Sequence, residues 1–349
     1  MKAEGKSKKA ESKRDASARA LSYFAFCLFT FTLLAACAAR PRGPLAYVSN
    51  ERDGTITVID TGRDEVVSTI RVGARPRGIR IGPDGRRVYV AVSTPSGKDY
   101  DHGENRIVAV DTGTGEVAAR YDVGTDPEQL AVHPDGTRLY ASNEDAGMAS
   151  VTDIRTGKQL ASLVVGVEPE GVTVSPDGRW VYVTAETSNT VSVIDTQADK
   201  VVSTFLVDSR PRDAAFSPDG ARAYVTTEIG RTVAVVDTSA HKVVHTIKVP
   251  RGENVKPMGV VVSNDGRRVY VATGRGNTVV AFDAASYEPL ATIPVGQRVW
   301  GLALTPDGRK LYAANGLSNE LSVIDTASNQ VIKTIKAGDG RWGIAISRE

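Results

Sequence analysis

The chain has 349 residues, of which 41% are hydrophobic and 24% charged, a composition typical of a soluble globular protein. Its formal net charge is +2, but residues 1–20 carry seven basic and three acidic side chains, so the remainder is close to −2. No strong field therefore draws the folded part toward nucleic acid or an anionic membrane. Both cysteines, Cys27 and Cys37, lie near the N-terminus, which excludes a disulfide, a thiolate nucleophile and a covalently attached c-type haem from the rest of the chain.

The N-terminal segment has the order of an export signal, a basic stretch followed by an apolar run over residues 21–39. The run ends in Leu34-Ala35-Ala36-Cys37, which resembles a bacterial lipobox, in which the cysteine is lipidated and becomes the mature N-terminus. This resemblance implies a lipoprotein-type signal peptide over 1–37, a tether over 38–44 and a periplasmic domain that is lipid-anchored to a bacterial membrane through Cys37. A retained membrane anchor and an ordinary cleaved signal remain alternatives, and all three place the folded domain outside the cytoplasm.

Residues 45–349 are built from one repeat. The phrase V-x-V-I-D-T recurs with steps of 51, 42, 42, 42, 46 and 42 residues between its aspartates, and a second phrase, P-D-G-x-x-x-Y-V, follows the same steps. The aspartates of the first phrase are Asp60, Asp111, Asp153, Asp195, Asp237, Asp283 and Asp325. Each unit contains four short runs with apolar and polar residues in alternation, which predicts strands; in the fourth unit these are 171–175, 180–184, 190–195 and 201–206. Four antiparallel strands at this period are typical of a propeller blade.

The two ends of the repeat region predict how the propeller closes. The chain enters the repeat at Leu45–Asn50 without a first strand, and it ends with that missing strand at Trp342–Ser347. The C-terminal strand is therefore expected to join the first blade, which removes free sheet edges. The predicted fold is all-β, a seven-bladed β-propeller with four antiparallel strands per blade.

Several phrases carry a family resemblance. AYVSNERDGTITVIDT and RRVYVA resemble the YVTN-repeat propellers. GVEPEGVTVSPDG, VDSRPRDAAFSPDG, TTEIGRTVAVVDT and VGQRVWGLALTPDG more closely resemble the β-propeller protein associated with PQQ-dependent alcohol catabolism, over Leu45 to Ile346. This resemblance implies a periplasmic companion of quinoprotein alcohol dehydrogenases, with such a dehydrogenase or its cytochrome as the partner. We expect a monomer with no cofactor of its own.

One face of the propeller is expected to carry the site, because the linkers before the inner strands differ there from blade to blade. The linker residues expected to ring the mouth of the central channel are Arg75, Arg77, Asp126, Glu128, Glu168, Glu170, Arg210, Arg212, Lys256, Arg298, Trp300, Arg341 and Trp342. The residues just after the second strands, Glu51, Glu144, Glu186 and Glu228 among them, belong to the same face. Arginine pairs bidentately with carboxylate or phosphate groups, and tryptophan stacks on flat or apolar ligands. Mutual salt bridges across the channel, and tryptophans that merely plug it, remain alternatives.

Metal and histidine chemistry find little support in the sequence. An insertion in the second blade offers Asp99, Asp101, His102 and Glu104, but a solvated loop explains this composition as well as a metal site does, and we predict no metal. His133, His241 and His245 fall away from the candidate face, so we interpret them as surface residues rather than catalytic bases.

These observations predict a non-catalytic extracytoplasmic propeller that binds a ligand or protein partner and is accessory to PQQ-dependent alcohol oxidation. One alternative is a metal-assisted enzyme of the lactonase or lyase type, for which the acidic residues Asp126, Glu128, Glu168 and Glu170 are the place to look. The other is a nucleic-acid- or haem-binding periplasmic propeller. The near-neutral domain argues against nucleic acid, and the lack of a channel histidine argues against haem.

Overall fold

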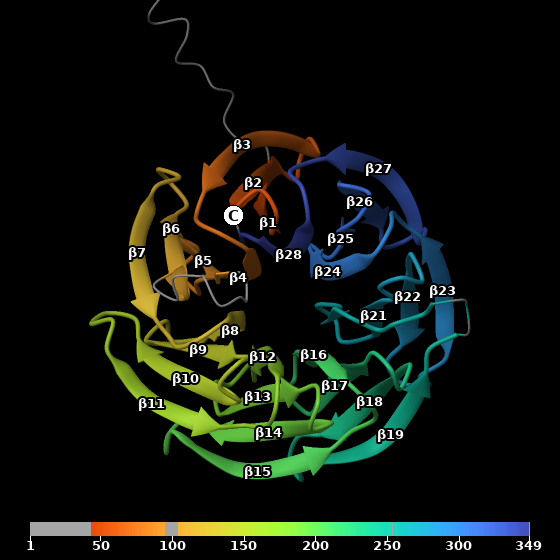
Figure 1. Ribbon diagram of the computed structural model, residues 1–349. Helices are drawn as coiled ribbons and strands as arrows, with labels where there is room; N and C mark the ends of the chain where they lie inside the picture. The colour runs from red at the N-terminus through yellow and green to blue at the C-terminus, as the bar shows by residue number, and fades with distance from the viewer. Residues whose placement is uncertain (1–42, 95–103, 251, 253, 349) are drawn as a thin grey trace, which may run out of the picture. The chain divides into compact units, whose positions relative to one another are not determined.

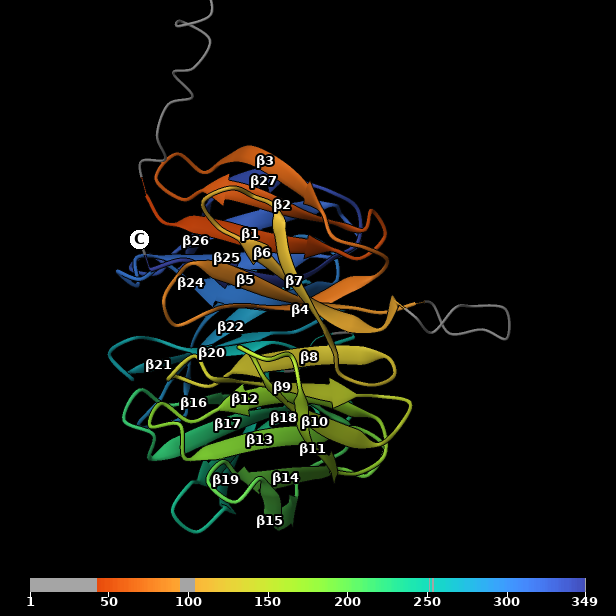
Figure 2. The same cartoon turned by 90° about the vertical axis from the view of Figure 1, so that its left-hand side faces the viewer.

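Seven four-stranded antiparallel sheets stand around a central axis in the computed structural model, which describes residues 43–94, 104–250, 252 and 254–348 (Figure 1). Figure 2 shows the same sheets from the side, with β3 and β15 on opposite sides of the ring. The predicted all-β, seven-bladed propeller with four antiparallel strands per blade is confirmed. Residues 1–42, with the predicted signal segment and Cys37, lie outside the described residues, as do Asp99, Asp101 and His102. The part of the chain that the structure describes contains no helix with the length and apolarity of a membrane span.

Each blade runs from an innermost strand beside the axis to an outermost strand at the rim. The innermost strands are β28 (Arg341–Ile346), β4 (Pro76–Ile81), β8 (Pro127–Val132), β12 (Pro169–Val174), β16 (Pro211–Phe216), β20 (Val260–Val262) and β24 (Val299–Leu304). The second strands are β1 (Leu45–Asn50), β5 (Arg87–Val92), β9 (Arg138–Asn143), β13 (Trp180–Ala185), β17 (Arg222–Thr227), β21 (Arg268–Ala272) and β25 (Lys310–Asn315). The third strands are β2 (Thr55–Asp60), β6 (Arg106–Asp111), β10 (Met148–Asp153), β14 (Thr190–Asp195), β18 (Thr232–Asp237), β22 (Thr278–Asp283) and β26 (Glu320–Asp325). The outermost strands are β3 (Glu65–Arg71), β7 (Val117–Asp122), β11 (Gln159–Val164), β15 (Lys200–Leu206), β19 (Lys242–Lys248), β23 (Pro289–Pro294) and β27 (Gln330–Lys336).

The core lies between neighbouring blades. The second and third strands are buried on both faces, whereas the outermost strand β15 alternates between exposed and half-buried residues. Tyr182 of one blade packs against Phe216 of the next, with ring centroids 4.7 Å apart. Blade-to-blade packing of this kind explains why apolar residues occupy consecutive positions in the second and third strands rather than strictly alternating ones.

Hydrogen bonds explain why the two repeat phrases occur together. The threonine of the D-T phrase donates its hydroxyl to the carbonyl of the P-D-G glycine in the same blade, at 2.7 Å from Thr196 to Gly178 and 2.7 Å from Thr326 to Gly308. Gly178 has φ +76°, a backbone conformation that favours glycine. In the blades that have both the threonine and the P-D-G glycine, the two phrases therefore join the ends of the blade on the face opposite the candidate site.

Closure follows the predicted route. β28 pairs antiparallel with β1, with Tyr47 opposite Ala345 and Val48 opposite Ile344. The N–H of Leu45 donates to Ser347 Oγ at 2.7 Å, which ties the two ends of the ring together. The last strand thus supplies the innermost strand of the first blade.

Candidate functional site

The residues expected at the channel mouth lie on the innermost strands or shortly before the first residue of these strands. Arg77, Glu128, Glu170 and Arg212 are each the second residue of such a strand, because β4, β8, β12 and β16 begin at the preceding proline. In the fourth blade the strand starts at Pro169, two residues earlier than predicted. Proline is tolerated as the first residue of a strand, where its missing N–H costs no ladder hydrogen bond. The strands therefore hold these side chains on rigid backbone.

The residue before each of these strands has a left-handed backbone, with φ of 44° at Asp126, 55° at Glu168 and 62° at Arg210. Its carbonyl accepts the N–H of the residue that follows the second strand, at 2.9 Å from Glu186 to Glu168 and 2.8 Å from Glu228 to Arg210. Non-glycine residues in this conformation are strained, and such strain gathers at functional sites. The turn brings the glutamates after the second strands to the mouth.

Hydroxyl groups bind neighbouring blades just below the mouth. Thr184 Oγ1 accepts the N–H of Gly171 at 2.8 Å and donates to the carbonyl of Arg212 in the next blade at 3.0 Å. Ser142 Oγ donates in the same way to the carbonyl of Glu170 at 2.6 Å. The backbone beneath the charged side chains is thereby fixed across blade boundaries.

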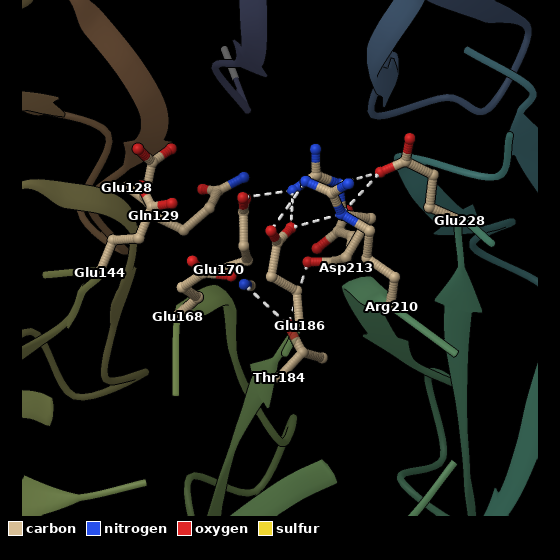
Figure 3. Close-up of polar contacts among 12 residues, drawn as sticks. Glu128, Gln129, Glu144, Glu168, Glu170, Thr184, Glu186, Arg210, Asp213 and Glu228 are labelled. Atoms are coloured by element: carbon tan, nitrogen blue, oxygen red, sulfur yellow. Dashed lines mark hydrogen bonds and ion pairs between the residues drawn. The ribbon is translucent and has the colours of Figure 1, made fainter. Parts of the chain in front are cut away.

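Arg212 is the centre of a buried ion-pair network, whose glutamates Glu170, Glu186 and Glu228 are labelled in Figure 3. Its Nη1 contacts Glu170 Oε1 and Glu186 Oε2, and its Nε lies 3.1 Å from Glu228 Oε2. The exposed fraction is 11% for the Arg212 side chain, 10% for Glu170 and 6% for both Glu186 and Glu228. Burial by itself lowers the pKa of Arg212, but the three carboxylates outweigh it and raise that pKa. Arg212 is therefore a permanent and well-oriented cation.

Two further cations complete this network. Arg210 Nη2 lies 2.8 Å from Glu186 Oε1, and Lys256 Nζ lies 2.9 Å from Glu228 Oε1. Burial raises the pKa of Glu228, but Arg212, Lys256 and Arg210 together outweigh it and hold that pKa below its usual value. Glu228 is consequently a structural anion.

A second network surrounds Arg77. Its Nε donates to Glu51 Oε1 at 2.9 Å, its Nη1 contacts Glu128 Oε1, and Nη1 lies 3.9 Å from Glu144 Oε2. Glu128 is 1% exposed, whereas the Glu144 side chain is 25% exposed. We call Arg77, Glu128, Glu144, Glu170, Glu186, Arg210, Arg212 and Glu228 together the mouth cluster.

Glu144 links the two networks. One of its carboxylate oxygens lies within 4.8 Å of oxygens of Asp126 and Glu128, and one within 4.8 Å of oxygens of Glu170 and Glu186. Burial raises the pKa of Glu144, Asp126 raises it further, and Arg77 only partly offsets them. Its carboxylate accepts no hydrogen bond from the described residues. Glu144 is thus a half-buried carboxylate whose affinity for a proton is increased and whose one ion pair from the described residues is the 3.9 Å contact with Arg77.

The same distances define two groups of three carboxylates with the spacing of a cation site, Asp126 with Glu128 and Glu144, and Glu144 with Glu170 and Glu186. In both groups a guanidinium already contacts the carboxylates, Arg77 in the first and Arg212 in the second. Arginine therefore supplies the positive charge that a metal ion would bring.

Other predicted mouth residues have different surroundings. Glu168 accepts the hydroxyl of Thr187 at the rim, and Arg75 Nη1 lies 3.5 Å from Asp126 Oδ1. Arg341 is 1% exposed and donates from Nη2 to the carbonyl of Gly338 at 2.5 Å, and burial lowers its pKa to about 10. Arg341 is therefore part of the packing between two blades rather than of the mouth cluster.

Trp300 and Trp342 lie side by side, with ring centroids 5.6 Å apart and planes inclined by 22°. The guanidinium carbon of Arg298 lies 4.9 Å from the centroid of Trp300, and that of Arg212 lies 5.5 Å from it. These contacts place an aromatic pair against the mouth cluster.

Beneath the mouth is a cavity of about 360 Å³, lined by the innermost strands. Three of its polar residues, Arg80, Gln129 and Asp213, were not among the predicted site residues. The sequence could have indicated two of them. The position directly after the mouth residues Arg77, Glu128 and their equivalents is glycine in five blades, and it is Gln129 or Asp213 in the other two. The three histidines that the structure describes lie elsewhere: His133 bonds to the carbonyl of Gly178, His241 to the hydroxyl of Tyr182, and His245 stacks on Tyr287.

Comparison with known proteins gives one family match. The family described as "Lactonase, 7-bladed beta-propeller" matches residues 98–205 and 207–336. No curated protein matches the chain.

Many solved structures resemble the chain. Hydrazine synthase of Kuenenia stuttgartiensis is 22% identical with a TM-score of 0.72, over 82% of this chain and 94% of that one. A functionally unknown protein from Desulfotomaculum acetoxidans is 20% identical with a TM-score of 0.73, over 87% and 98%. A putative 6-phosphogluconolactonase from Bacteroides fragilis is 18% identical with a TM-score of 0.73, over 88% and 99%. At these identities the likeness shows the fold alone.

The family match overturns the expectation of a non-catalytic accessory protein, which was wrong. That expectation rested on the resemblance of four blade-specific phrases to one propeller family, whereas the family model matches more than half of the chain. The alternative of a lactonase-type propeller enzyme is better supported. The resemblance to the PQQ-associated propeller, with a dehydrogenase or cytochrome as partner, stays a prediction.

Proposed function

Since the chain belongs to the lactonase family of seven-bladed β-propellers, we propose that it is a hydrolase that opens a lactone at the mouth cluster. The observation that carries this proposal is the position of Glu144, a carboxylate with a raised pKa that accepts no hydrogen bond from the described residues, beside the fixed guanidinium groups of Arg77 and Arg212. A base and a preorganised cation are the two parts that ester hydrolysis requires.

Glu144 is the general base in this proposal. Its pKa is raised by burial and by Asp126, which makes the carboxylate a stronger base than an exposed glutamate. The side chain remains 25% exposed, so a water molecule has access to it. Glu186 has a raised pKa as well, through burial and Glu170, but both of its oxygens are occupied by Arg210 and Arg212. Glu144 is therefore the carboxylate that is free to accept a proton.

Arg212 is the group that stabilises the oxyanion. Nη1 and Nε are held by carboxylates, and Nη2 takes no part in those contacts. Donors fixed before the reaction need no reorganisation as negative charge develops on the carbonyl oxygen, and this is where their catalytic effect arises. The three carboxylates thus orient a cation that would otherwise adopt many rotamers.

The reaction follows from these roles. Water gives a proton to Glu144 and its oxygen bonds to the lactone carbonyl carbon, while the carbonyl oxygen becomes an oxyanion that Arg212 stabilises. The bond from that carbon to the ring oxygen then breaks, and the ring oxygen takes the proton from Glu144. One lactone and one water give one hydroxy acid, and the enzyme returns to its starting state.

The cellular location is a proposal from the sequence alone. The lipobox-like Leu34-Ala35-Ala36-Cys37 supports a periplasmic enzyme held at a bacterial membrane through lipidated Cys37. Mass spectrometry of the membrane fraction tests this: an N-terminal diacylated cysteine is expected, and an unmodified Cys37 within an intact N-terminus contradicts it.

Activity is tested on a panel of γ- and δ-lactones, and hydrolysis is measured as the amount of acid released. Glu144→Gln is expected to lower kcat by at least about 100-fold, as loss of a general base does. Glu288→Gln, an exposed glutamate in an outer turn, is the matched control and is expected to leave kcat unchanged. Equal activity of Glu144→Gln and wild type would remove Glu144 from the mechanism, and no hydrolysis of any lactone would overturn the proposal itself.

A further inference from the structure

The cavity below the mouth cluster is continuous with it. Its lining includes Glu170, Arg212, Trp300 and Trp342, which are second residues of innermost strands, and it reaches Ile81 and Ile346, which are the last residues of theirs. A ligand whose reacting group lies at the mouth can therefore extend along the inner strands. At about 360 Å³ the cavity falls within the size range of small-molecule sites.

The cavity has two different walls. Three consecutive blades, those of β20, β24 and β28, contribute an apolar wall of Met258, Val261, Leu302, Trp342 and Ile344, with Trp300 at its upper edge. The blades of β4, β8, β12 and β16 contribute the polar residues Arg80, Gln129, Thr173 and Asp213. The large apolar side chains of the lining, apart from Ile81 of β4, are thus gathered along one side of the channel.

The charged groups of the polar wall are occupied by the protein. Asp213 accepts the N–H of Ala214 at 2.9 Å and that of Val260 at 3.3 Å, and Arg80 donates to the carbonyl of Ile79 at 2.9 Å. The charges of Arg80 and Asp213 also act on each other, so this wall presents no net charge to a ligand. A ligand group that enters the channel therefore gains most from the apolar wall.

Glycines allow the inner strands of the apolar wall to approach each other closely. Gly301 and Gly259 come directly after the second position of their blades, and a Cβ there would lie 2.7 Å from the carbonyl oxygen of Trp342 and 2.5 Å from that of Trp300. The inner strands of the apolar wall therefore approach each other closely, with no side chain at this level on that side of the channel.

We propose that the channel binds an apolar substituent of the substrate, so that the enzyme acts on lactones that carry an alkyl or aryl arm rather than on polyhydroxylated sugar lactones. The inference rests on the proposed function, because the mouth cluster must hold the lactone ring while the arm lies along Leu302 and Ile344. Trp300 and Trp342 cover the arm where it leaves the ring.

The first test is a substrate series of γ-lactones whose C4 substituent grows from hydrogen to hexyl, with glucono-δ-lactone and 6-phosphoglucono-δ-lactone as polar comparators. The kcat/KM is expected to rise about fourfold with each methylene that enters the channel, since this is the effect of burying one methylene. A preference for either sugar lactone, or equal values across the alkyl series, overturns the inference while the proposed function stands.

Two channel variants refine the test. Ala215→Leu adds volume to the channel wall and is expected to abolish the gain from the longer arms while leaving unsubstituted γ-butyrolactone unaffected. Val261→Ala removes volume and is expected to shift the preference toward longer arms. Ala285→Leu, at an exposed outer turn, is the matched control and is expected to follow wild type. Loss of the long-arm preference in this control as well would contradict a role for the channel.

A binding measurement keeps the inference testable if no lactone is hydrolysed, an outcome that refutes only the proposed function. Octanoate and gluconate are titrated against wild type and Ala215→Leu, with tryptophan fluorescence as the readout because Trp300 and Trp342 line the cavity. Octanoate is expected to change the fluorescence at concentrations at least tenfold lower than gluconate, and Ala215→Leu is expected to weaken octanoate alone. Equal responses to both anions overturn the apolar site.

Discussion

Arg210 binds Glu186 through two parallel hydrogen bonds, from Nε to Oε2 at 3.0 Å and from Nη2 to Oε1 at 2.8 Å. This fork geometry fixes the carboxylate, which Arg212 also contacts from the channel side. Glu186 is in consequence a support for the two arginines rather than a proton acceptor. The structural role of Glu186 and the catalytic role of Glu144 can be tested by comparing how a substitution at each residue changes stability and activity.

Glu186→Gln is expected to lower the free energy of unfolding by about 3 kcal/mol, because it leaves two arginines at the mouth without one of their carboxylates. Urea denaturation measures this. Glu144→Gln is the matched comparison and is expected to cost much less, since the Glu144 carboxylate accepts no hydrogen bond from the described residues. The reverse order of the two costs would show that Glu144 is the structural carboxylate.

The pH dependence of kcat/KM is expected to show an acidic limb above the usual pKa of glutamate, because burial and Asp126 raise the pKa of Glu144 and only the deprotonated form accepts a proton. Arg77 opposes that shift, so Arg77→Gln is expected to move the limb to still higher pH. A pH–rate profile of both proteins checks this. A limb at the same pH in the variant would exclude Glu144 as the titrating group.

The stability of the folded protein should also depend on pH because the pKa of Glu144 is raised. A carboxyl group whose pKa is higher in the folded protein stabilises it below the unfolded pKa, and this contribution disappears as the pH rises through the folded value. The contribution from Glu144 is therefore present in acid and lost toward neutral pH. The free energy of unfolding of Glu144→Gln, measured relative to that of wild type, is therefore expected to increase from about pH 5 to about pH 7. Thermal unfolding at both pH values measures the difference, and a constant offset would contradict it.

Arg212→Lys is expected to lower kcat by about 100-fold although the positive charge is kept, because an ammonium group cannot reproduce the planar fork that joins Glu170, Glu186 and Glu228. Arg231→Lys serves as the control, since Arg231 lies on the exposed turn between β17 and β18. Similar kinetics for wild type and Arg212→Lys would mean that charge alone suffices at this position.

Removal of divalent cations with EDTA is expected to leave kcat unchanged, because guanidinium groups already neutralise both groups of carboxylates at the mouth. Activity before and after dialysis against the chelator measures this. Loss of activity that calcium or zinc restores would instead assign a metal to Asp126, Glu128 and Glu144.

Gly301→Ala is expected to destabilise the propeller by about 2 kcal/mol, because the new Cβ would lie 2.7 Å from the carbonyl oxygen of Trp342 in the next blade. Gly113→Ala is the control, since its Cβ would approach only the side chain of Asp111. Denaturant titration of both variants decides between a packing role and mere flexibility for Gly301.

The number of blades, the pairing of the last strand with β1 and the face that carries the variable residues could all be predicted from the sequence. They depend on local patterns: alternation within strands, and turns in which Asp, Thr and Gly bond to each other within one blade, as Thr196 and Gly178 do. The first residue of the innermost strands could not be predicted, because a proline is as typical of a linker as of the first position of a strand.

The pairing of charges was decided by the tertiary structure alone. Glu170 and Arg212 are 42 residues apart and meet only because adjacent blades stand at a fixed angle to each other. Arg341 lies beside the mouth residues in the sequence, but it takes the position that proline or valine has in the other blades, where the side chain is buried in every blade. Which carboxylate remains free, and hence the role of Glu144, depends on how long side chains share a few partners across a channel, and no periodic pattern in a single chain encodes that.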